Sequence, residues 1–158
     1  MTDFARLLAT LVDSDVRFIL VGGVAATVHG SARLTRDVDV VYDRSRDNIE
    51  RLVGSLSAHH PVLRGAPPDL PFRFDLPTVA AGFNFTLTTD LGDLDLLGEI
   101  AGGGMYPDLI ARAVSIEAFG RRCHCLSLDQ LIAVKRAAGR PKDVEAVAEL
   151  EIIRDRTS

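Results

Sequence analysis

Alternating aspartate and valine residues at positions 37–42 constrain this chain more than any other segment. The run reads Asp-Val-Asp-Val-Val-Tyr, and such alternation with β-branched residues predicts a strand. Side chains two positions apart on a strand share a face, which places Asp37 beside Asp39. Two like charges held together repel, and a divalent cation between them relieves that repulsion. A solvated edge strand or a turn entrance explains the same pair without a ligand.

The composition is that of one globular domain. Of the 158 residues, 47% are hydrophobic and 25% charged, which excludes disordered and fibrous chains. A formal net charge of -4 argues against a protein that coats nucleic acid by bulk charge, although a local patch for RNA stays possible. The longest uncharged apolar run, residues 18–28, is eleven residues, whereas a membrane span needs about twenty. No basic region precedes an apolar stretch at the N-terminus, so we expect a cytoplasmic protein with Cys123 and Cys125 reduced.

Periodicity and turn signals predict an α/β (α+β) fold, a small mixed sheet flanked by helices. We expect strands over residues 17–21, 37–42, 83–89, 93–97 and 121–126. We expect a helix capped by Thr2, and further helices over residues 24–29, 45–58, 109–114, 127–138 and 143–153. Residues 60–77 hold five of the seven prolines and are predicted to form a long irregular connection, functional or mobile.

Two glycines stand where the first strand turns into a helix. Gly22 and Gly23 have no Cβ, so backbone N–H groups there can approach a polyphosphate beside a helix N-terminus. A tight turn with no ligand is the simpler reading of the pair alone.

Residues 83–89 and 93–97 are joined by a short turn and predicted to form a hairpin, and a further acid lies on its second arm. Asp95 is flanked by leucines, and a carboxylate on such a strand is costly unless it binds something. Asp93, beside the turn, is predicted to be a solvated end residue.

Basic residues gather in two places. Arg33, Thr35 and Arg36 immediately precede the acidic strand. Their cationic donors and hydroxyl would suit a bound triphosphate. An exposed basic loop without a ligand is the alternative interpretation. Residues 121–142 carry six basic residues against one acid. That segment predicts a phosphate or nucleic-acid contact, with a solvated helix face as the alternative for some of its members.

Together these features resemble the nucleotidyltransferase superfamily whose palm is shared with DNA polymerase beta. The shared pattern is the glycine pair, thirteen residues between Gly23 and Asp37, Asp-hydrophobic-Asp, and a later carboxylate at Asp95. The run VGGVAATVHGSARLTRDVDVVYD resembles stand-alone bacterial nucleotidyltransferases related to abortive-infection and toxin–antitoxin systems. The tail LIAVKRAAGRPKD resembles their later lysine and basic-aspartate motifs, so the likeness covers about residues 17–145.

The resemblance implies one domain over residues 1–158, with a polymerase-beta-like catalytic palm over 1–100 and a basic strand with C-terminal helices over 105–158. It implies that Asp37, Asp39 and Asp95 are catalytic and hold two Mg²⁺ ions. It also implies a nucleotide site that binds an NTP such as ATP. The residues expected there are Gly22, Gly23, Arg33, Thr35, Arg36, Lys135 and Lys142.

The implied reaction moves an NMP from the NTP to a hydroxyl on RNA or protein. The implied setting is a toxin–antitoxin or phage-defence system with a neighbour-encoded partner protein. One alternative is a catalytically silent module of the same fold that binds nucleotide or a partner. A metal-dependent phosphohydrolase using the same acids is another. The presence of all three carboxylates favours the enzyme.

Overall fold

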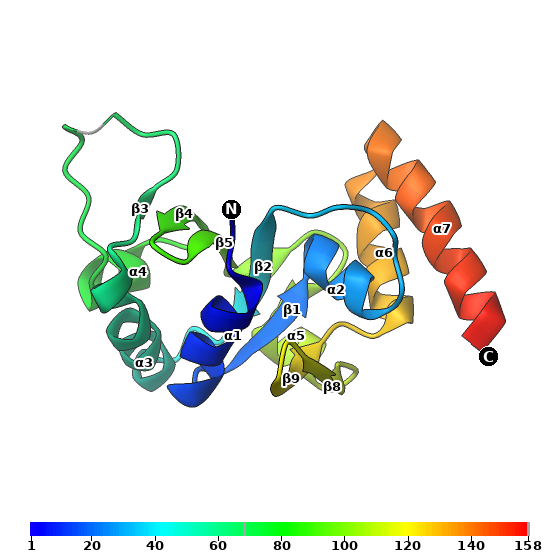
Figure 1. The fold of residues 1–158 in the computed structure, drawn as a ribbon, viewed down its shortest axis with the longest axis horizontal. Helices are drawn as coiled ribbons and strands as arrows, with labels where there is room; N and C mark the ends of the chain where they lie inside the picture. The colour runs from blue at the N-terminus through cyan, green and yellow to red at the C-terminus, as the bar shows by residue number, and fades with distance from the viewer. Residues whose placement is uncertain (68, 158) are drawn as a thin grey trace.

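The computed structural model describes residues 1–67 and 69–157, which form a mixed sheet with helices around it (Figure 1). The seven-stranded sheet has the order β3-β4-β5-β2-β1-β9-β8. Its strands are β1 (Phe18–Val21), β2 (Asp37–Tyr42), β3 (Val62–Leu63), β4 (Phe85–Thr89), β5 (Gly92–Leu97), β8 (Val114–Ala118) and β9 (Arg121–Cys125). A small second sheet pairs β6 (Glu99–Ile100) with β7 (Gly104–Met105). The predicted α/β class is confirmed.

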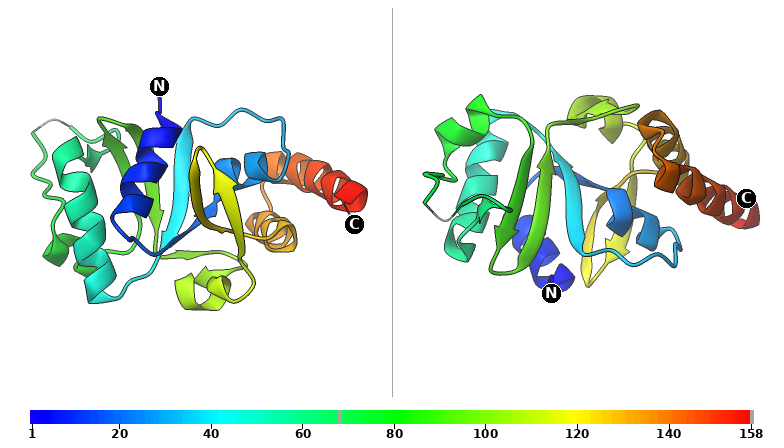
Figure 2. Two further views of the ribbon diagram at one scale, coloured as in Figure 1. Left: turned by 60° about the horizontal axis from the view of Figure 1, so that its bottom comes forward. Right: turned by 90° about the horizontal axis from the view of Figure 1, so that it is seen from above.

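The helices connect and cover these strands. They are α1 (Phe4–Asp13), α2 (Gly22–Val28), α3 (Arg46–Leu56), α4 (Leu76–Ala81), α5 (Tyr106–Ile110), α6 (Leu128–Ala138) and α7 (Pro141–Thr157), with a 3-10 turn at Ser57–His59. Helix α1 contacts α3 and β9, while α2 and α5 contact the central strand β1 (Figure 2). Helix α7 packs on α6 at one end of the molecule (Figure 1).

The centre of the sheet is made of apolar strand residues. All four residues of β1 are buried, and β1 pairs antiparallel with β2 and parallel with β9. Strand β2 pairs on its other side with β5, in parallel. The fully buried leucines and valines of these strands join those of α1 and α3 in one core. Burial on this scale is the main source of stability for a chain of this length.

The first helix begins differently from the prediction. Asp3, rather than Thr2, is its N-cap, and the Asp3 carboxylate accepts a hydrogen bond from the Arg6 N–H. The Thr2 hydroxyl instead donates to the carbonyl of Arg36 and accepts from the N–H of Asp93. The N-terminal segment thereby ties together the entrances of β2 and β5.

The region between the hairpin and the last strand was also predicted in part wrongly. The helix expected at 109–114 lies earlier, at α5, and residues 114–118 form strand β8. Strand β8 pairs antiparallel with β9, a long-range partner that local periodicity cannot identify. Strand β3 lies inside the proline-rich stretch and α4 begins at its end; residue 68 of that stretch is outside the described residues.

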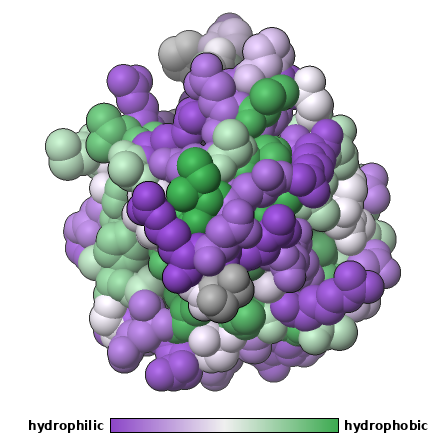
Figure 3. All heavy atoms as spheres, turned by 90° about the vertical axis from the view of Figure 1, so that its right-hand side faces the viewer, coloured by the Kyte–Doolittle hydropathy of each residue, from purple (hydrophilic) through white to green (hydrophobic). Residues whose placement is uncertain are grey.

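No helix among residues 1–67 and 69–157 is long and apolar enough to cross a membrane. The end of the molecule that carries α7 is shown in Figure 3, where hydrophobic side chains form small patches between hydrophilic ones. Val144 and Ile152 of α7 are among the exposed hydrophobic residues.

Candidate active site

The parallel pairing of β2 with β5 sets the positions of the acidic side chains. Asp39 stands opposite Asp95, and Asp37 opposite Asp93. The alternation of each strand puts these carboxyl groups on one face and buries the intervening valines and leucines on the other. One carboxylate oxygen from each of Asp37, Asp39 and Asp95 lies within 4.8 Å of the other two. These three residues are called the acidic cluster below.

The acidic cluster resists full ionisation. Burial, followed by the charges of Asp37 and Asp95, raises the pKa of Asp39 to about 8. Burial also raises the pKa of Asp37, and the neighbouring Asp95 adds to that rise. The Oδ1 of Asp39 is buried and accepts no hydrogen bond from any described residue, whereas the buried Oδ1 of Asp95 has the Arg64 guanidinium 2.9 Å away. A buried acceptor without a donor is costly, so a cation bound here would relieve both the charge repulsion and the missing contacts.

The donor set fits Mg²⁺. All of its candidate ligand atoms are carboxylate oxygens, which hard divalent cations prefer. Asp37, Asp39 and Asp95 would be the protein ligands, contributed by two strands whose backbones are hydrogen-bonded to each other. The rigid sheet therefore fixes the spacing of the ligands before any cation arrives.

The glycine pair is explained by two close approaches. Gly22 has a φ of +67°, and a Cβ built on it would collide with the carboxylate of Asp39. A Cβ on Gly23 would come within 2.7 Å of the Thr35 hydroxyl oxygen. The Thr35 hydroxyl in turn donates to the carbonyl of Asp37. Because Gly22 and Gly23 have no side chains, the turn between β1 and α2 can pack closely against Asp39 and Thr35.

A cavity of about 170 Å³ opens beside Gly23. Its lining includes four of the other predicted nucleotide-site residues, namely Arg33, Thr35, Lys135 and Lys142. Thr35 lines this cavity and its hydroxyl donates to the carbonyl of Asp37, so the cavity adjoins the acidic strand. The structure thus brings the glycine pair, three cationic side chains and the acids to one region.

Residues of α7 hold two of these cations in place. The Lys135 ammonium lies 3.7 Å from the carboxylate of Asp143, which is itself buried and paired with Arg140. The Arg33 guanidinium lies 3.5 Å from Glu145 and 3.6 Å from Glu149. Helix α7 therefore forms one wall of the cavity and orients its positive charges.

Arg36 lies elsewhere. It is exposed and lines a separate hollow of about 590 Å³ beside the chain N-terminus and the β4–β5 hairpin. That hollow also includes Thr35 and Asp93, so it reaches the edge of the acidic face.

Sequence reasoning missed Arg64, which follows β3 in the proline-rich stretch. Its Nη2 lies 2.9 Å from Asp95 Oδ1, its Nη1 3.7 Å from Asp37 and its Nε 3.5 Å from Asp93. Asp93 was predicted to be a solvated end residue, but it also accepts a hydrogen bond from Thr88. No local pattern marked Arg64, because its approach depends on the pairing of β3 with β4.

The two cysteines and His29 contribute no ligand to the acidic cluster. The thiols of Cys123 and Cys125 are buried, and burial raises their pKa values to about 11 and about 12. The His29 ring nitrogen Nε2 is 2.8 Å from the carbonyl oxygen of Leu126.

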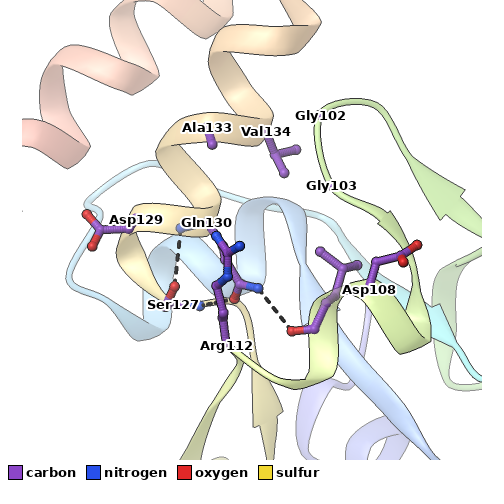
Figure 4. A pocket seen from close by; sticks show the side chains of 10 residues that line it. Gly102, Gly103, Asp108, Arg112, Ser127, Asp129, Gln130, Ala133 and Val134 are labelled. Atoms are coloured by element: carbon purple, nitrogen blue, oxygen red, sulfur yellow. Dashed lines mark hydrogen bonds between the residues drawn. The ribbon is translucent and has the colours of Figure 1, made fainter.

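The hollow drawn in Figure 4, of about 490 Å³, lies between α5 and α6. Gln130 donates there to the carbonyl of Leu109, and Ser127 caps α6. The residues that line it include none of the predicted site residues.

Comparison with solved structures places this geometry among known folds. The lincosamide antibiotic adenylyltransferase LnuA, bound to lincomycin, superposes with a TM-score of 0.62 at 15% identity, covering 96% of each chain. The chain has the nucleotidyltransferase fold. A candidate nucleotidyltransferase from Thermotoga maritima gives 0.59 at 17% identity, covering 94% of each chain. ANT(2″)-Ia in complex with adenylyl-2″-tobramycin gives 0.54 at 17% identity, covering 99% of this chain and 100% of that one. No family model and no curated protein sequence matches the chain.

Proposed function

We propose that this protein is a divalent-cation-dependent nucleotidyltransferase that moves an NMP from an NTP to an acceptor hydroxyl. The observation that carries the proposal is the acidic cluster, in which three carboxylates converge and the buried Oδ1 of Asp39 accepts no hydrogen bond from the described residues. Three carboxylates that converge on one face of a nucleotidyltransferase fold are suited to Mg²⁺ and a triphosphate.

Mg²⁺ would be held by Asp37, Asp39 and Asp95, with two ions expected, and would supply charge neutralisation and an acidified hydroxyl. The chain itself positions the substrate. Lys135, Lys142 and Arg33 line one cavity and would bind the triphosphate oxygens through charge-assisted hydrogen bonds. Asp95 would accept the proton of the acceptor hydroxyl. The backbone N–H groups of Gly22 and Gly23 would contact a phosphate from the start of α2, which lies close against Asp39 and Thr35.

The acceptor and the biological setting are further parts of this proposal. RNA and protein hydroxyls were expected from the sequence, together with a toxin–antitoxin or phage-defence setting and a partner protein. The named ligands of two structural neighbours, lincomycin and adenylylated tobramycin, add small hydroxylated molecules. We also propose that residues 1–100 act as the palm and residues 105–158 as its basic counterpart in a single domain.

The second candidate is a silent nucleotide-binding module. Arg64 favours it, since its guanidinium forms ion pairs with two members of the acidic cluster where a cation would bind.

Incubation with each α-labelled NTP and Mg²⁺ tests the proposal. The acceptor panel is total RNA, lysate protein, an aminoglycoside and a lincosamide. The Asp37→Ala/Asp39→Ala variant is expected to lose transfer by orders of magnitude. Asp90→Ala, an exposed acid of the same hairpin, is the matched control and is expected to retain it.

Three results would contradict the enzyme. NTP binding without transfer to any acceptor indicates the silent module, and release of γ-phosphate in place of pyrophosphate indicates a hydrolase. Absence of Mg²⁺–NTP binding rejects the site itself.

A further inference from the structure

Arg64 is fixed at its backbone and extended across two strands. Its N–H donates to the carbonyl of Thr86 on β4, at 2.9 Å. Its Nη2 donates to the carbonyl of Leu87, also on β4, at 2.7 Å. From this anchor the guanidinium reaches over β5 to β2, where it meets three carboxylates that no other described arginine contacts.

The guanidinium of Arg64 does not bind any of the three acids in the strongest ion-pair geometry. An arginine binds a carboxylate most strongly through two parallel hydrogen bonds to one group. Arg64 makes no such pair, because its three contacts of 2.9–3.7 Å go to three different carboxylates. Its Nε is buried and has no hydrogen-bond partner in the described part of the chain. Arg64 is therefore a positive charge near the cluster, held chiefly by the β4 carbonyl.

Asp93 gives the guanidinium a second place to bind. It lies opposite Asp37 in the register but outside the acidic cluster, and its side chain is 36% exposed, against 21% for Asp95. An arginine displaced from Asp37 and Asp95 keeps Asp93 and the Leu87 carbonyl as partners. Displacement then costs less than expelling a buried charge without a partner.

We propose that Arg64 is a built-in counter-cation of the acidic cluster, which a divalent cation displaces toward Asp93 when it binds. This inference rests on the proposed function, because it assigns the cluster to a divalent cation. Arg64 acts through Asp37 and Asp95 and is a positioning residue. It keeps the carboxylates from repelling one another in the cation-free protein and sets the concentration at which the cation enters.

Titration with Mn²⁺ in the absence of nucleotide tests the proposal directly, with free Mn²⁺ followed by electron paramagnetic resonance at fixed pH. Arg64→Gln is expected to bind Mn²⁺ roughly tenfold more tightly than wild type, since the competing charge is gone. Arg64→Lys keeps the charge on a more compact group and is expected to lie between the two. Arg73→Gln removes the same charge from an exposed position later in the stretch and is expected to match wild type.

Thermal unfolding supplies a readout that a merely structural role would not produce. Without a divalent cation, Arg64→Gln is expected to unfold at a lower temperature than wild type, because its carboxylates have lost their counter-charge. Saturating Mn²⁺ is expected to raise the unfolding temperature of Arg64→Gln more than that of wild type, so that the difference closes. Arg73→Gln is expected to show neither effect.

The outcomes separate the two proposals. Equal Mn²⁺ affinity for wild type and Arg64→Gln, or weaker binding by the variant, overturns the role of Arg64 and leaves the cation site in place. Equal tightening by Arg73→Gln also overturns it, because bulk charge would then explain the effect. If wild type and all variants fail to bind Mn²⁺, the cation site of the proposed function is wrong, and the role of Arg64 falls with it.

Discussion

Gly22 lies against the carboxylate of Asp39 at a separation that leaves no room for a Cβ. The contact joins the turn at the end of β1 to the acidic strand, and the φ of +67° at Gly22 independently disfavours any other residue. The glycine is thus required by two constraints, one steric and one conformational.

Gly22→Ala is accordingly expected to lower the free energy of unfolding by about 1–3 kcal/mol and to reduce Mn²⁺ binding, since Asp39 must move. Urea unfolding and Mn²⁺ titration measure the two effects. Gly54→Ala is the control, because Gly54 lies inside α3 with open space around its Cβ position. That change is expected to raise stability by up to about 1 kcal/mol. Equal effects of the two substitutions would contradict the steric account.

Asp39→Asn is expected to stabilise the cation-free protein while abolishing transfer. With a pKa of about 8, folded Asp39 keeps a proton that the unfolded chain, with a pKa of 3.8, has already lost. Wild-type stability without cation therefore falls as the pH rises from about 4 to about 8. Asparagine cannot ionise, so the variant should show a flatter profile and gain about 1–2 kcal/mol at pH 8. Thermal unfolding at several pH values in a chelator checks this, and parallel profiles for both proteins would refute it.

Lys135→Met is expected to weaken NTP binding. Loss of one charge-assisted contact to a phosphate costs about 1.5–3 kcal/mol, which corresponds to a roughly 10- to 100-fold higher Kd. Titration with a fluorescent nucleotide measures the Kd of each variant. Arg136→Met, next along α6, removes an exposed cation whose ion-pair partner is Glu151, and its Kd is expected to stay near that of wild type. Comparable weakening by both variants would argue for a general charge effect.

Asp143→Asn is expected to lower stability by about 1–3 kcal/mol at neutral pH, since the buried carboxylate would lose its ion pairs with Arg140 and Lys135. The hydrogen bond from Arg140 lowers the pKa of Asp143, so its contribution is present above pH 4 and is lost as the pH falls further. Wild type and variant should therefore converge in acid-unfolding curves. Asp129→Asn, an exposed partner of Arg154, is expected to change stability by less than about 0.5 kcal/mol, and a larger loss there would undermine the comparison.

The acids could be predicted from the sequence because strand alternation is local. Asp37 and Asp39 share a face by spacing alone, and Asp95 followed from the cost of a carboxylate between leucines. Their meeting depends on the parallel register of β2 and β5, which local spacing does not encode. The family resemblance implied only that the three acids share one metal site. The sequence also showed that basic side chains gather in two segments, but local patterns did not indicate which of these side chains line one cavity.

The sequence failed where a role depends on distant pairing. Strand β8 was not predicted: its first residue, Val114, was placed at the end of a helix, and the other four were assigned to no element, because the strand depends on its pairing with β9. Arg64 was passed over because only the two-residue strand β3 brings it to the acids. The role of α7 was likewise hidden, since its glutamates contact Arg33 across more than a hundred positions.

The parallel pairing of β2 with β5 has a consequence for how this molecule could diversify. The distance between the acids is set by main-chain hydrogen bonds, which do not depend on side-chain identity elsewhere. Main-chain pairing therefore holds the two acidic strands in register even where side chains far from the site differ. The same sheet can accordingly persist through extensive sequence change, and the chain shares its fold with solved structures at only 15–17% identity.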